Sequence, residues 1–374
     1  MSVISVQKVP SYDLPLLSEA VKRHFEILDV EKDLRPNMRI LIKPNLVSAR
    51  KPDTAVTTNP ILLTAIIKWL RDRGITNIII ADSPGGPYTS AALRTVYSVC
   101  GIKPLEKIAK LNYDTSWQVV SCEEKFANHS FNIISPICDA DYIINVAKLK
   151  THAITTISAG IKNMFGAIPG LQKPELHYRH VDIQSFSNML VDLALTTKPN
   201  ITVIDAVDAM EGNGPNSGTV KHTGTIFASR DVFAQDWYAS LFMGIPPETV
   251  PMLHIARDRG YIIPEEIVVR GNAGKMQQEP FILPESLDPR FLQYVPKAFR
   301  APFQTIVTKL LMPFPKFDQQ KCIGCGKCAE SCPPHIITIQ DGKASAPHKG
   351  CINCLCCQEM CPVHAIGARR LLRR

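Results

Sequence analysis

Short apolar runs rich in β-branched residues alternate with amphipathic segments along the first 272 residues of the chain. The runs predict β-strands at residues 38–43, 76–81, 142–146, 201–204, 225–228 and 266–270. Between them, apolar residues recur every three or four positions, which predicts helices at 60–73, 90–100, 183–196 and 231–243. Pro60 suits a first helical position, and Gly74 and Gly101 follow as stop signals. This alternation predicts an α/β fold with a largely parallel sheet flanked by helices.

The composition changes after residue 272. With 374 residues, the chain has room for two or three domains. We expect an α/β domain over residues 1–272, a proline-rich connector over 273–316, a small cysteine-rich α+β domain over 317–368 and a basic tail over 369–374. The apolar segment 303–312 of the connector either packs between the two domains or grazes a membrane surface. The tail is expected to be a solvated chain end, with docking to an acidic partner or a membrane surface as the alternative.

Eight of the twelve cysteines form two runs with the spacing C-x2-C-x2-C-x3-C-P. In this pattern the first three cysteines of a run hold one iron–sulfur cube, and the fourth completes the other cube. We therefore predict two [4Fe–4S] clusters, one on Cys322, Cys325, Cys328 and Cys361 and one on Cys351, Cys354, Cys357 and Cys332. A zinc ribbon is the alternative, but it needs only two C-x2-C pairs and would leave four of the cysteines unused.

The cysteine-rich segment resembles the bacterial two-cluster ferredoxins over residues 317–368, and it contains every ligand position of that pattern. The resemblance implies a ferredoxin-like domain. Because so small a domain has little apolar core, its clusters must also hold the fold together. Cys356 lies beside a ligand but out of register, so we interpret it as a packing residue, and we expect Cys100, Cys122 and Cys138 to be small buried hydrophobic residues.

Charge and targeting signals narrow the class of partner. The formal charge of +8 falls to about +4 once the thiolates and two oxidised cubes are counted. This value argues weakly for an acidic protein partner and does not indicate nucleic-acid binding. The first residues carry no signal-peptide pattern, and no segment approaches the length of a membrane span. Because cluster thiolates persist in a reducing compartment, we expect a cytoplasmic protein.

Polar residues follow four of the predicted strands. In an open parallel sheet, the carboxyl ends of the strands line one crevice where ligands bind. The sequence therefore predicts a crevice lined by Lys43, Asn45, Asp82, Lys148, Lys150, His152, Asp205 and Glu211. Lys148, Lys150 and His152 stand at alternate positions, so in an extended segment they would present one cationic face to a carboxylate or phosphate. An exposed edge strand protected by lysines is the alternative.

Three further features point to the same crevice. The glycine-rich segment 158–170 lets backbone amides approach a ligand, and it contains Gly160, Lys162 and Asn163. It matches neither a Walker loop nor G-x-G-x-x-G, and a turn-rich structural connection is the alternative. His180 precedes a predicted helix start, where it can serve acid–base work or anion recognition. Asp205, Asp208 and Glu211 can offer carboxylates to a divalent cation, with turn chemistry as the rival interpretation.

These motifs together resemble the family catalogued as domain of unknown function 362. The resemblance rests on Lys43-Pro44-Asn45, Asp82-Ser83-Pro84-Gly85, Lys148 to His152, Gly160 to Asn163 and Glu211 to Gly214, and it covers roughly residues 38–270. It implies an α/β domain that often carries a ferredoxin module, without a settled reaction. A weaker similarity, from His152 through Lys162 to Gly170, is to the amino-terminal domain of the lactate racemase family. It implies a nickel-pincer nucleotide on Lys162 and a site role for His152, although Ala159 and Ile161 stand where that family is glycine-rich.

The sequence thus predicts a redox enzyme that passes electrons through two clusters to a small anionic substrate or cofactor in the α/β crevice. Lysines would hold the anion, His152 or His180 would move protons, and carboxylates would orient groups or bind a divalent metal or a further cofactor. The partner would be a protein that donates or accepts electrons. The alternative is a non-catalytic ferredoxin-like electron carrier, or an assembly adaptor, whose α/β part recognises another protein.

Overall fold

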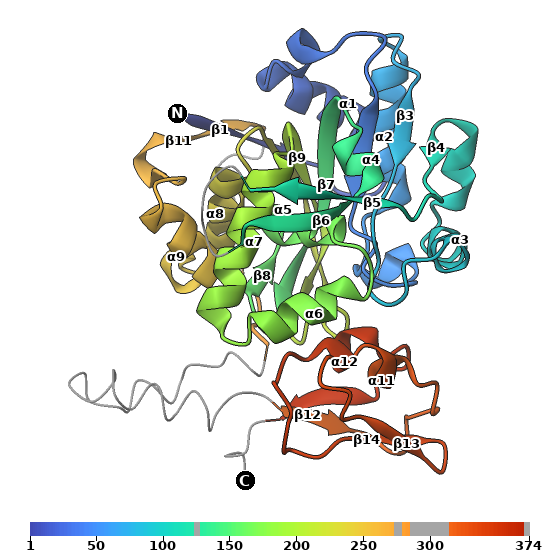
Figure 1. Cartoon of the computed structure of the whole chain (residues 1–374). Helices are drawn as coiled ribbons and strands as arrows, with labels where there is room; N and C mark the ends of the chain where they lie inside the picture. The colour runs from blue at the N-terminus through green and yellow to red at the C-terminus, as the bar shows by residue number, and fades with distance from the viewer. Residues whose placement is uncertain (123–127, 273–278, 285–313, 370–374) are drawn as a thin grey trace, which may run out of the picture.

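The computed structural model describes residues 1–122, 128–272, 279–284 and 314–369 (Figure 1). In this part of the chain, the α/β domain is built on a nine-stranded sheet with the order β11-β1-β10-β9-β7-β2-β3-β4. Five strands run parallel to one another: β2 (Ile40–Pro44), β3 (Ile78–Ile80), β4 (Lys110–Leu111), β7 (Tyr142–His152) and β9 (Ile201–Glu211). Antiparallel pairing enters through β10 (Thr219–Ser229), which lies between β9 and β1 (Ser2–Lys8). The remaining strands are β11 (Ile267–Gly271), parallel to β1, and β8 (Thr156–Ser158), antiparallel to β7.

Helices cover both faces of the sheet and form two separate hydrophobic cores. Ile40 and Ile42 of β2 pack into one core, whereas Leu41 between them packs into the other, as the alternation of strand side chains requires. The first core contains residues of α1 (Leu14–Ile27), α2 (Pro60–Arg71) and α3 (Ser90–Val99). The second contains residues of α5 (Gly160–Asn163), α7 (Ile183–Thr197), α8 (Val232–Phe242) and α9 (Pro251–Asp258). A separate hairpin of β5 (Trp117–Ser121) and β6 (Ser130–Ile134) leads into α4 (Ser135–Cys138), and α6 (Gln172–Arg179) precedes α7.

The small domain consists of two antiparallel strand pairs and two short helices. The strand β12 (Phe314–Phe317) pairs with β15 (Ile366–Arg369), and β13 (Thr338–Gln340) pairs with β14 (Lys343–Ser345). The helices α11 (Lys327–Glu330) and α12 (Cys356–Met360) face the α/β domain (Figure 1). Four cysteines make up much of its small buried core, together with Ile337, Ala344, Ala365 and Ile366.

The predicted fold class is confirmed, but several strands and helices begin or end at other residues than predicted. All six predicted strands are present, but β7 and β9 continue past their predicted ends to His152 and Glu211. The polar residues expected in loops after these strands therefore lie within the strands themselves. The glycine-rich segment is not an open loop, because it forms α5 and the 3-10 helix Met164–Ala167. The predicted segment 303–312 and most of the basic tail lie outside the described residues. Within the described part, no helix has the length and apolar character needed to cross a membrane.

Candidate functional site

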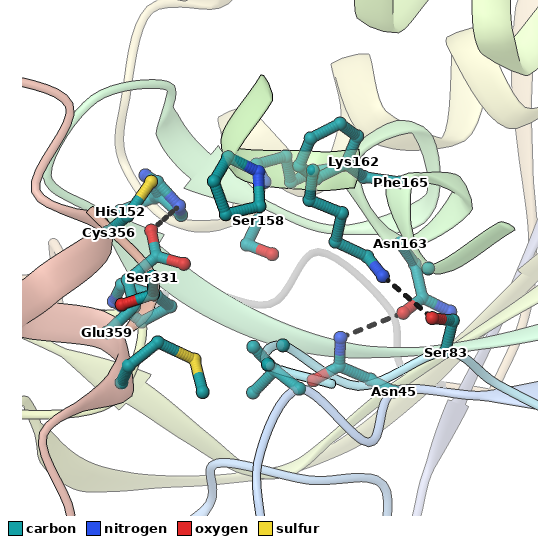
Figure 2. Close-up of a pocket in the computed structure, with 18 of the residues that line it drawn as sticks. Asn45, Ser83, His152, Ser158, Lys162, Asn163, Phe165, Ser331, Cys356 and Glu359 are labelled. Atoms are coloured by element: carbon teal, nitrogen blue, oxygen red, sulfur yellow. Dashed lines mark hydrogen bonds and ion pairs between the residues drawn. The ribbon is translucent and has the colours of Figure 1, made fainter. Parts of the chain in front are cut away.

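A pocket lies between the carboxyl ends of the sheet strands and the small domain (Figure 2). Figure 2 shows His152 close to Cys356 and Glu359 on one side, with Asn45, Asn163 and Ser83 across the pocket. The α/β domain supplies most of the wall, and the small domain closes it with Ser331, Cys356, Glu359 and Met360. Of the residues predicted for the crevice, six line this pocket: Asn45, Asp82, Lys150, His152, Lys162 and Asn163.

Lys162 is the cation of this pocket that has no hydrogen-bond or ion-pair partner among the described residues. Its side chain lies above the Phe165 ring, with Nζ 4.4 Å from the ring centroid, and the residue is only 9% exposed. Burial lowers the pKa of Lys162, although the charge of Glu359 acts in the opposite direction. A buried ammonium without an acceptor is costly, so the position favours a ligand that brings a negative charge.

Lys150 begins a chain of buried side-chain hydrogen bonds. Its Nζ donates to Asn45 Oδ1 at 2.9 Å and to the Val56 carbonyl at 2.8 Å. Asn45 Nδ2 then donates to Asn163 Oδ1 at 2.8 Å, and Asn163 Nδ2 donates to Asn145 Oδ1 at 2.7 Å. Burial lowers the pKa of Lys150 to about 7. The chain fixes each amide in one orientation and leaves one of the three N–H donors of Lys150 without a protein acceptor.

A buried ion pair and a second lysine support the loop after β3. Lys43 Nζ donates to Asp82 Oδ1 at 2.7 Å and to the Asn163 carbonyl at 2.6 Å, and Asp82 Oδ2 accepts from the Leu46 N–H at 2.7 Å. Gly166 passes so close that a Cβ there would lie 2.0 Å from Asp82 Oδ1, so the pair requires glycine at this position. Lys173, which the sequence did not single out, donates to Ser83 Oγ at 2.9 Å. Burial lowers the pKa of Lys173 to about 7.

His152 meets Glu359 of the small domain across the pocket. The backbone N–H groups of Ile154 and Thr155 donate to His152 Nδ1 at 3.1 Å and 3.3 Å. Because Nδ1 accepts, the proton of the neutral ring lies on Nε2, which is 3.2 Å from Glu359 Oε1. Burial lowers the pKa of His152, and the contact with Glu359 opposes this shift. The two backbone donors hold the ring in one tautomer, and its Nε2 lies at ion-pair distance from a carboxylate of the other domain without the geometry of a hydrogen bond.

The short helix α5, which carries Lys162 and Asn163, is anchored from beneath by Asp236. The Asp236 carboxylate accepts from the N–H of Gly160 at 2.7 Å and of Ile161 at 2.8 Å. Burial raises the pKa of Asp236 to about 7, and the two N–H donors oppose the shift. A Cβ at Gly160 would lie 2.9 Å from Asp236 Oδ1, so glycine is needed for this approach. Gly160 thus faces Asp236, and it is not among the residues that line the pocket.

Several predicted site residues have partners away from the pocket lining. Lys148 Nζ contacts Asp205 Oδ2 at 3.1 Å and Tyr12 Oη at 2.7 Å, which makes Lys148 and Asp205 a buried ion pair. Glu211 Oε2 is 3.1 Å from Lys221 Nζ, while Asp208 contacts His222. His180 binds Ser185 and Asn128. The carboxylates of β9 thus point to separate partners, and no three His, Cys, Asp or Glu side chains of the described residues are close enough to hold a single metal ion.

The cysteines of the small domain line two separate cavities. One is lined by Cys322, Cys325, Cys328 and Cys361, and the other by Cys332, Cys351, Cys354 and Cys357. Backbone N–H groups donate to Cys361 Sγ at 3.1 Å and to Cys322 Sγ at 3.3 Å, as is common around iron–sulfur groups. The donor set and its spacing fit a 4Fe–4S group, which bonds each cysteine to a separate iron. The two sets are those predicted from the spacing, and their roles as ligands stay a prediction.

The pocket and the cysteine cavities share a wall. Ser331, Cys356 and Met360 line the pocket, and each directly precedes a cysteine of one of the two sets: Cys332, Cys357 and Cys361. Arg50 fastens this wall to the α/β domain by donating to the carbonyls of Cys361 at 2.8 Å and Pro362 at 2.6 Å. Ser217 contacts His364 across the same interface at 2.8 Å. Any group held by these cysteines thus lies one residue behind the pocket lining.

The fold and the site define an α/β protein with an attached 4Fe–4S binding domain. The chain belongs to the family described as Domain of unknown function (DUF362), which matches residues 40–240, and a 4Fe-4S binding domain matches residues 314–337. This confirms the predicted family. The thylakoid-associated protein sll1697 of Synechocystis sp. is 30% identical over 253 residues, which are 67% of this chain and 77% of that protein.

Two further proteins are similar over smaller parts of their length. Ferredoxin-2 of Desulfomicrobium norvegicum is 52% identical over 27 residues, which are 7% of this chain and 46% of that ferredoxin. Among solved structures, the lactate racemase apoprotein from Thermoanaerobacterium thermosaccharolyticum matches with a TM-score of 0.42 and 13% identity, over 64% of this chain and 56% of that chain. We draw no conclusion about the site from a likeness at this level.

Proposed function

We propose that this chain is an iron–sulfur oxidoreductase whose pocket holds a small anionic substrate or cofactor, with two [4Fe–4S] clusters directly behind the pocket wall. The observation that carries the proposal is the unpartnered Lys162 ammonium, buried in a pocket whose opposite wall alternates with cluster cysteines. Each cluster supplies or accepts one electron at a time, and the grouping of eight cysteines around two cavities supports a pair of them.

The pocket residues have separate tasks in this proposal. Lys162 binds the anion, and Lys150, with one unused donor and a pKa near neutrality, holds or gives a proton beside it. His152, oriented by its two backbone donors, lies with Nε2 at ion-pair distance from Glu359. The alternative of a non-catalytic electron carrier or adaptor predicts a shallow crevice, whereas the buried Lys150 and Lys162 and the half-buried Lys173, gathered in a pocket between the two domains, support an enzyme.

The proposal is tested by identifying the molecule that occupies the pocket. Mass spectrometry of small molecules released from anaerobically purified protein is expected to find an anionic compound at about one per chain. Mixing that compound with chemically reduced protein is then expected to restore the visible absorption of the oxidised clusters. If the released compound leaves the reduced spectrum unchanged, and if its reduced form does not bleach the oxidised spectrum, the pocket is not a redox site.

Anion binding is expected to weaken as the pH rises through about 7. The pKa of Lys150 and that of Lys173 both fall to about 7, so these lysines lose their charge within this range, while Lys43, Asp82, Lys162 and Glu359 complete the charged surroundings. Both shifts favour the neutral form, so affinity is full below pH 7 and declines above it. Calorimetry with sulfate, whose charge stays constant between about pH 6 and pH 9, should show a loss of about tenfold or more. An affinity independent of pH would contradict these assignments.

The cellular location of the protein stays a prediction. The expected clusters favour a reducing compartment such as the cytoplasm, whereas the relative from Synechocystis is named thylakoid-associated. Cell fractionation distinguishes a cytoplasmic from a membrane-associated protein. The amount of the protein and its iron content are measured in each fraction.

A further inference from the structure

The buried lysines of the α/β domain fall into two groups with different partners. Lys43 and Lys148 each contact a carboxylate, at 2.7 Å and 3.1 Å, and their charges are compensated within the protein. Lys150 and Lys162 line the pocket and contact no carboxylate of the described residues, and the half-buried Lys173 beside them belongs to the same group. Since buried charges in proteins are normally paired, the second group indicates a missing negative partner.

The contacts of the second group are all neutral. Lys150 donates to an amide oxygen and a backbone carbonyl, and Lys173 donates to the Ser83 hydroxyl and to the carbonyls of Pro84 and Ile168. Lys162 faces an aromatic ring. Neutral acceptors satisfy N–H groups, but they do not cancel the charge of an ammonium in a site removed from water. Below about pH 7, where Lys150 and Lys173 carry their protons, three positive charges therefore converge on the pocket without a direct ionic contact to a described residue.

Among the described residues that line the pocket, two carry carboxylates, Asp82 and Glu359. The negative charge of Asp82 is already compensated, because one of its oxygens accepts from Lys43 and the other from the Leu46 backbone N–H. Glu359 remains, and its carboxylate lies against His152 rather than against a lysine. With Lys43 and Asp82 cancelling, three lysines face one carboxylate among the lining residues, which leaves an excess of two positive charges.

We propose that the pocket takes an anion with two negative charges, such as a phosphoryl group or a dicarboxylate, in preference to a monocarboxylate. This inference rests on the proposed function, in that the pocket is the ligand site, and it adds the charge class of the ligand. The rival source of compensation is the clusters, whose thiolates give each cube a net negative charge. Their field reaches the pocket, but the ammonium of Lys162 still lacks an acceptor at hydrogen-bond distance, which a bound oxyanion supplies.

The test compares the affinities of inorganic ions for the anaerobically prepared holoprotein at about pH 6.5, where Lys150 and Lys173 are mostly protonated. Sulfate and inorganic phosphate are expected to bind about tenfold or more tightly than acetate and nitrate. Succinate is included because tighter binding of succinate than of phosphate assigns a dicarboxylate, and the reverse assigns a phosphoryl group; either result supports a doubly charged ligand. Equal affinity for singly and doubly charged ions overturns the inference.

Two variants change the excess charge in opposite directions. Lys173→Met should lower the preference for sulfate over acetate by about tenfold, and Glu359→Gln should raise the affinity for sulfate by about the same factor. Lys22→Met, on the exposed surface of α1, is the matched control and should change neither quantity. If Lys173→Met alters only the midpoint potential of the clusters and no ion selectivity, the lysines serve the clusters alone and the inference is wrong.

The outcome is separable from that of the proposed function. Ion affinity needs no electron transfer, so a chain that selects doubly charged ions but never exchanges electrons with its natural ligand contradicts only the oxidoreductase. A chain that does exchange electrons with a singly charged compound, and that does not discriminate between ion charges, contradicts only the charge class. The Glu359→Gln measurement remains decisive if Lys173→Met fails to fold.

Discussion

Replacing Lys162 by Met is expected to weaken anion binding by roughly 30- to 100-fold, because a charge-assisted hydrogen bond contributes about 2 to 3 kcal/mol. The same variant should stabilise the ligand-free protein by about 1 kcal/mol or more, because it removes a buried ammonium that has no partner. This combination of lost binding and gained stability identifies a residue kept for a ligand. Titration calorimetry and urea unfolding of the anaerobic protein measure the two effects.

Lys148→Met is the matched control, since Lys148 is also a buried lysine, at 1% exposed against 9% for Lys162, but pairs with Asp205. Its loss leaves that carboxylate without its cation, so the protein should lose about 3 to 5 kcal/mol of stability. Lys162→Arg, which keeps the charge, should retain part of the affinity. If Lys162→Met destabilises the ligand-free protein as Lys148→Met does, Lys162 is a structural residue and the proposed ligand site is wrong.

Replacing Arg50 by Met is expected to loosen the small domain from the α/β domain without loss of iron. The guanidinium donates to two backbone carbonyls of the cysteine segment, at 2.6 Å and 2.8 Å, and two such charged hydrogen bonds contribute about 3 kcal/mol or more. Electron exchange between the clusters and the pocket ligand should then slow by about tenfold or more, because the shared wall moves away. Stopped-flow absorption records the rate, and limited proteolysis reports the loosened interface.

A second variant, at Gly85 of the α/β domain, tests the same interface between the two domains independently. A Cβ on Gly85 would lie 2.5 Å from Met360 Sδ, so Gly85→Leu should also displace the wall, and Met360→Ala in the same chain should restore it. Arg23→Met, which removes an exposed ion pair of α1, is the control for Arg50→Met. Unchanged electron exchange in both Arg50→Met and Gly85→Leu would show that the docking of the two domains does not matter for the reaction.

The sequence predicted the features that depend on short-range residue spacing, which are the two cysteine sets and most of the strands and helices of the sheet domain. The spacing pattern assigns the first three cysteines of each run to one predicted ligand set and the fourth to the other, and the same two sets line the two cavities. The alternation of strands and helices predicted the sheet and its order of layers. Among the strands that were missed, β8 is short and contains Thr156 with a φ of +67°, whereas β1 is seven residues long and was not predicted from its pattern.

The pocket was only partly predictable, because its roof comes from another domain. The sequence pattern does not indicate that Glu359 contacts His152 or that Met360 lies against Gly85. The one feature of the sequence that marks Glu359 and Met360 is their position between two of the predicted ligand cysteines. Lys148 and Lys150 were expected to act together, but the pairing of β7 with β9 shifts register between them. Lys148 then meets Asp205 while Lys150 lines the pocket. Such a shift depends on tertiary pairing, which a strand pattern does not reveal.

The central claim is tested most directly by an assay of iron and acid-labile sulfide in the anaerobically purified chain. The electron paramagnetic resonance spectrum of the same reduced protein is then recorded before and after the addition of inorganic phosphate. A pair of clusters beside an anion pocket predicts about eight irons and about eight sulfides per chain, and a reduced spectrum that changes when phosphate binds. Zinc in place of iron, with no sulfide, would contradict the clusters, and a full complement of iron with a spectrum indifferent to phosphate would contradict their link to the pocket.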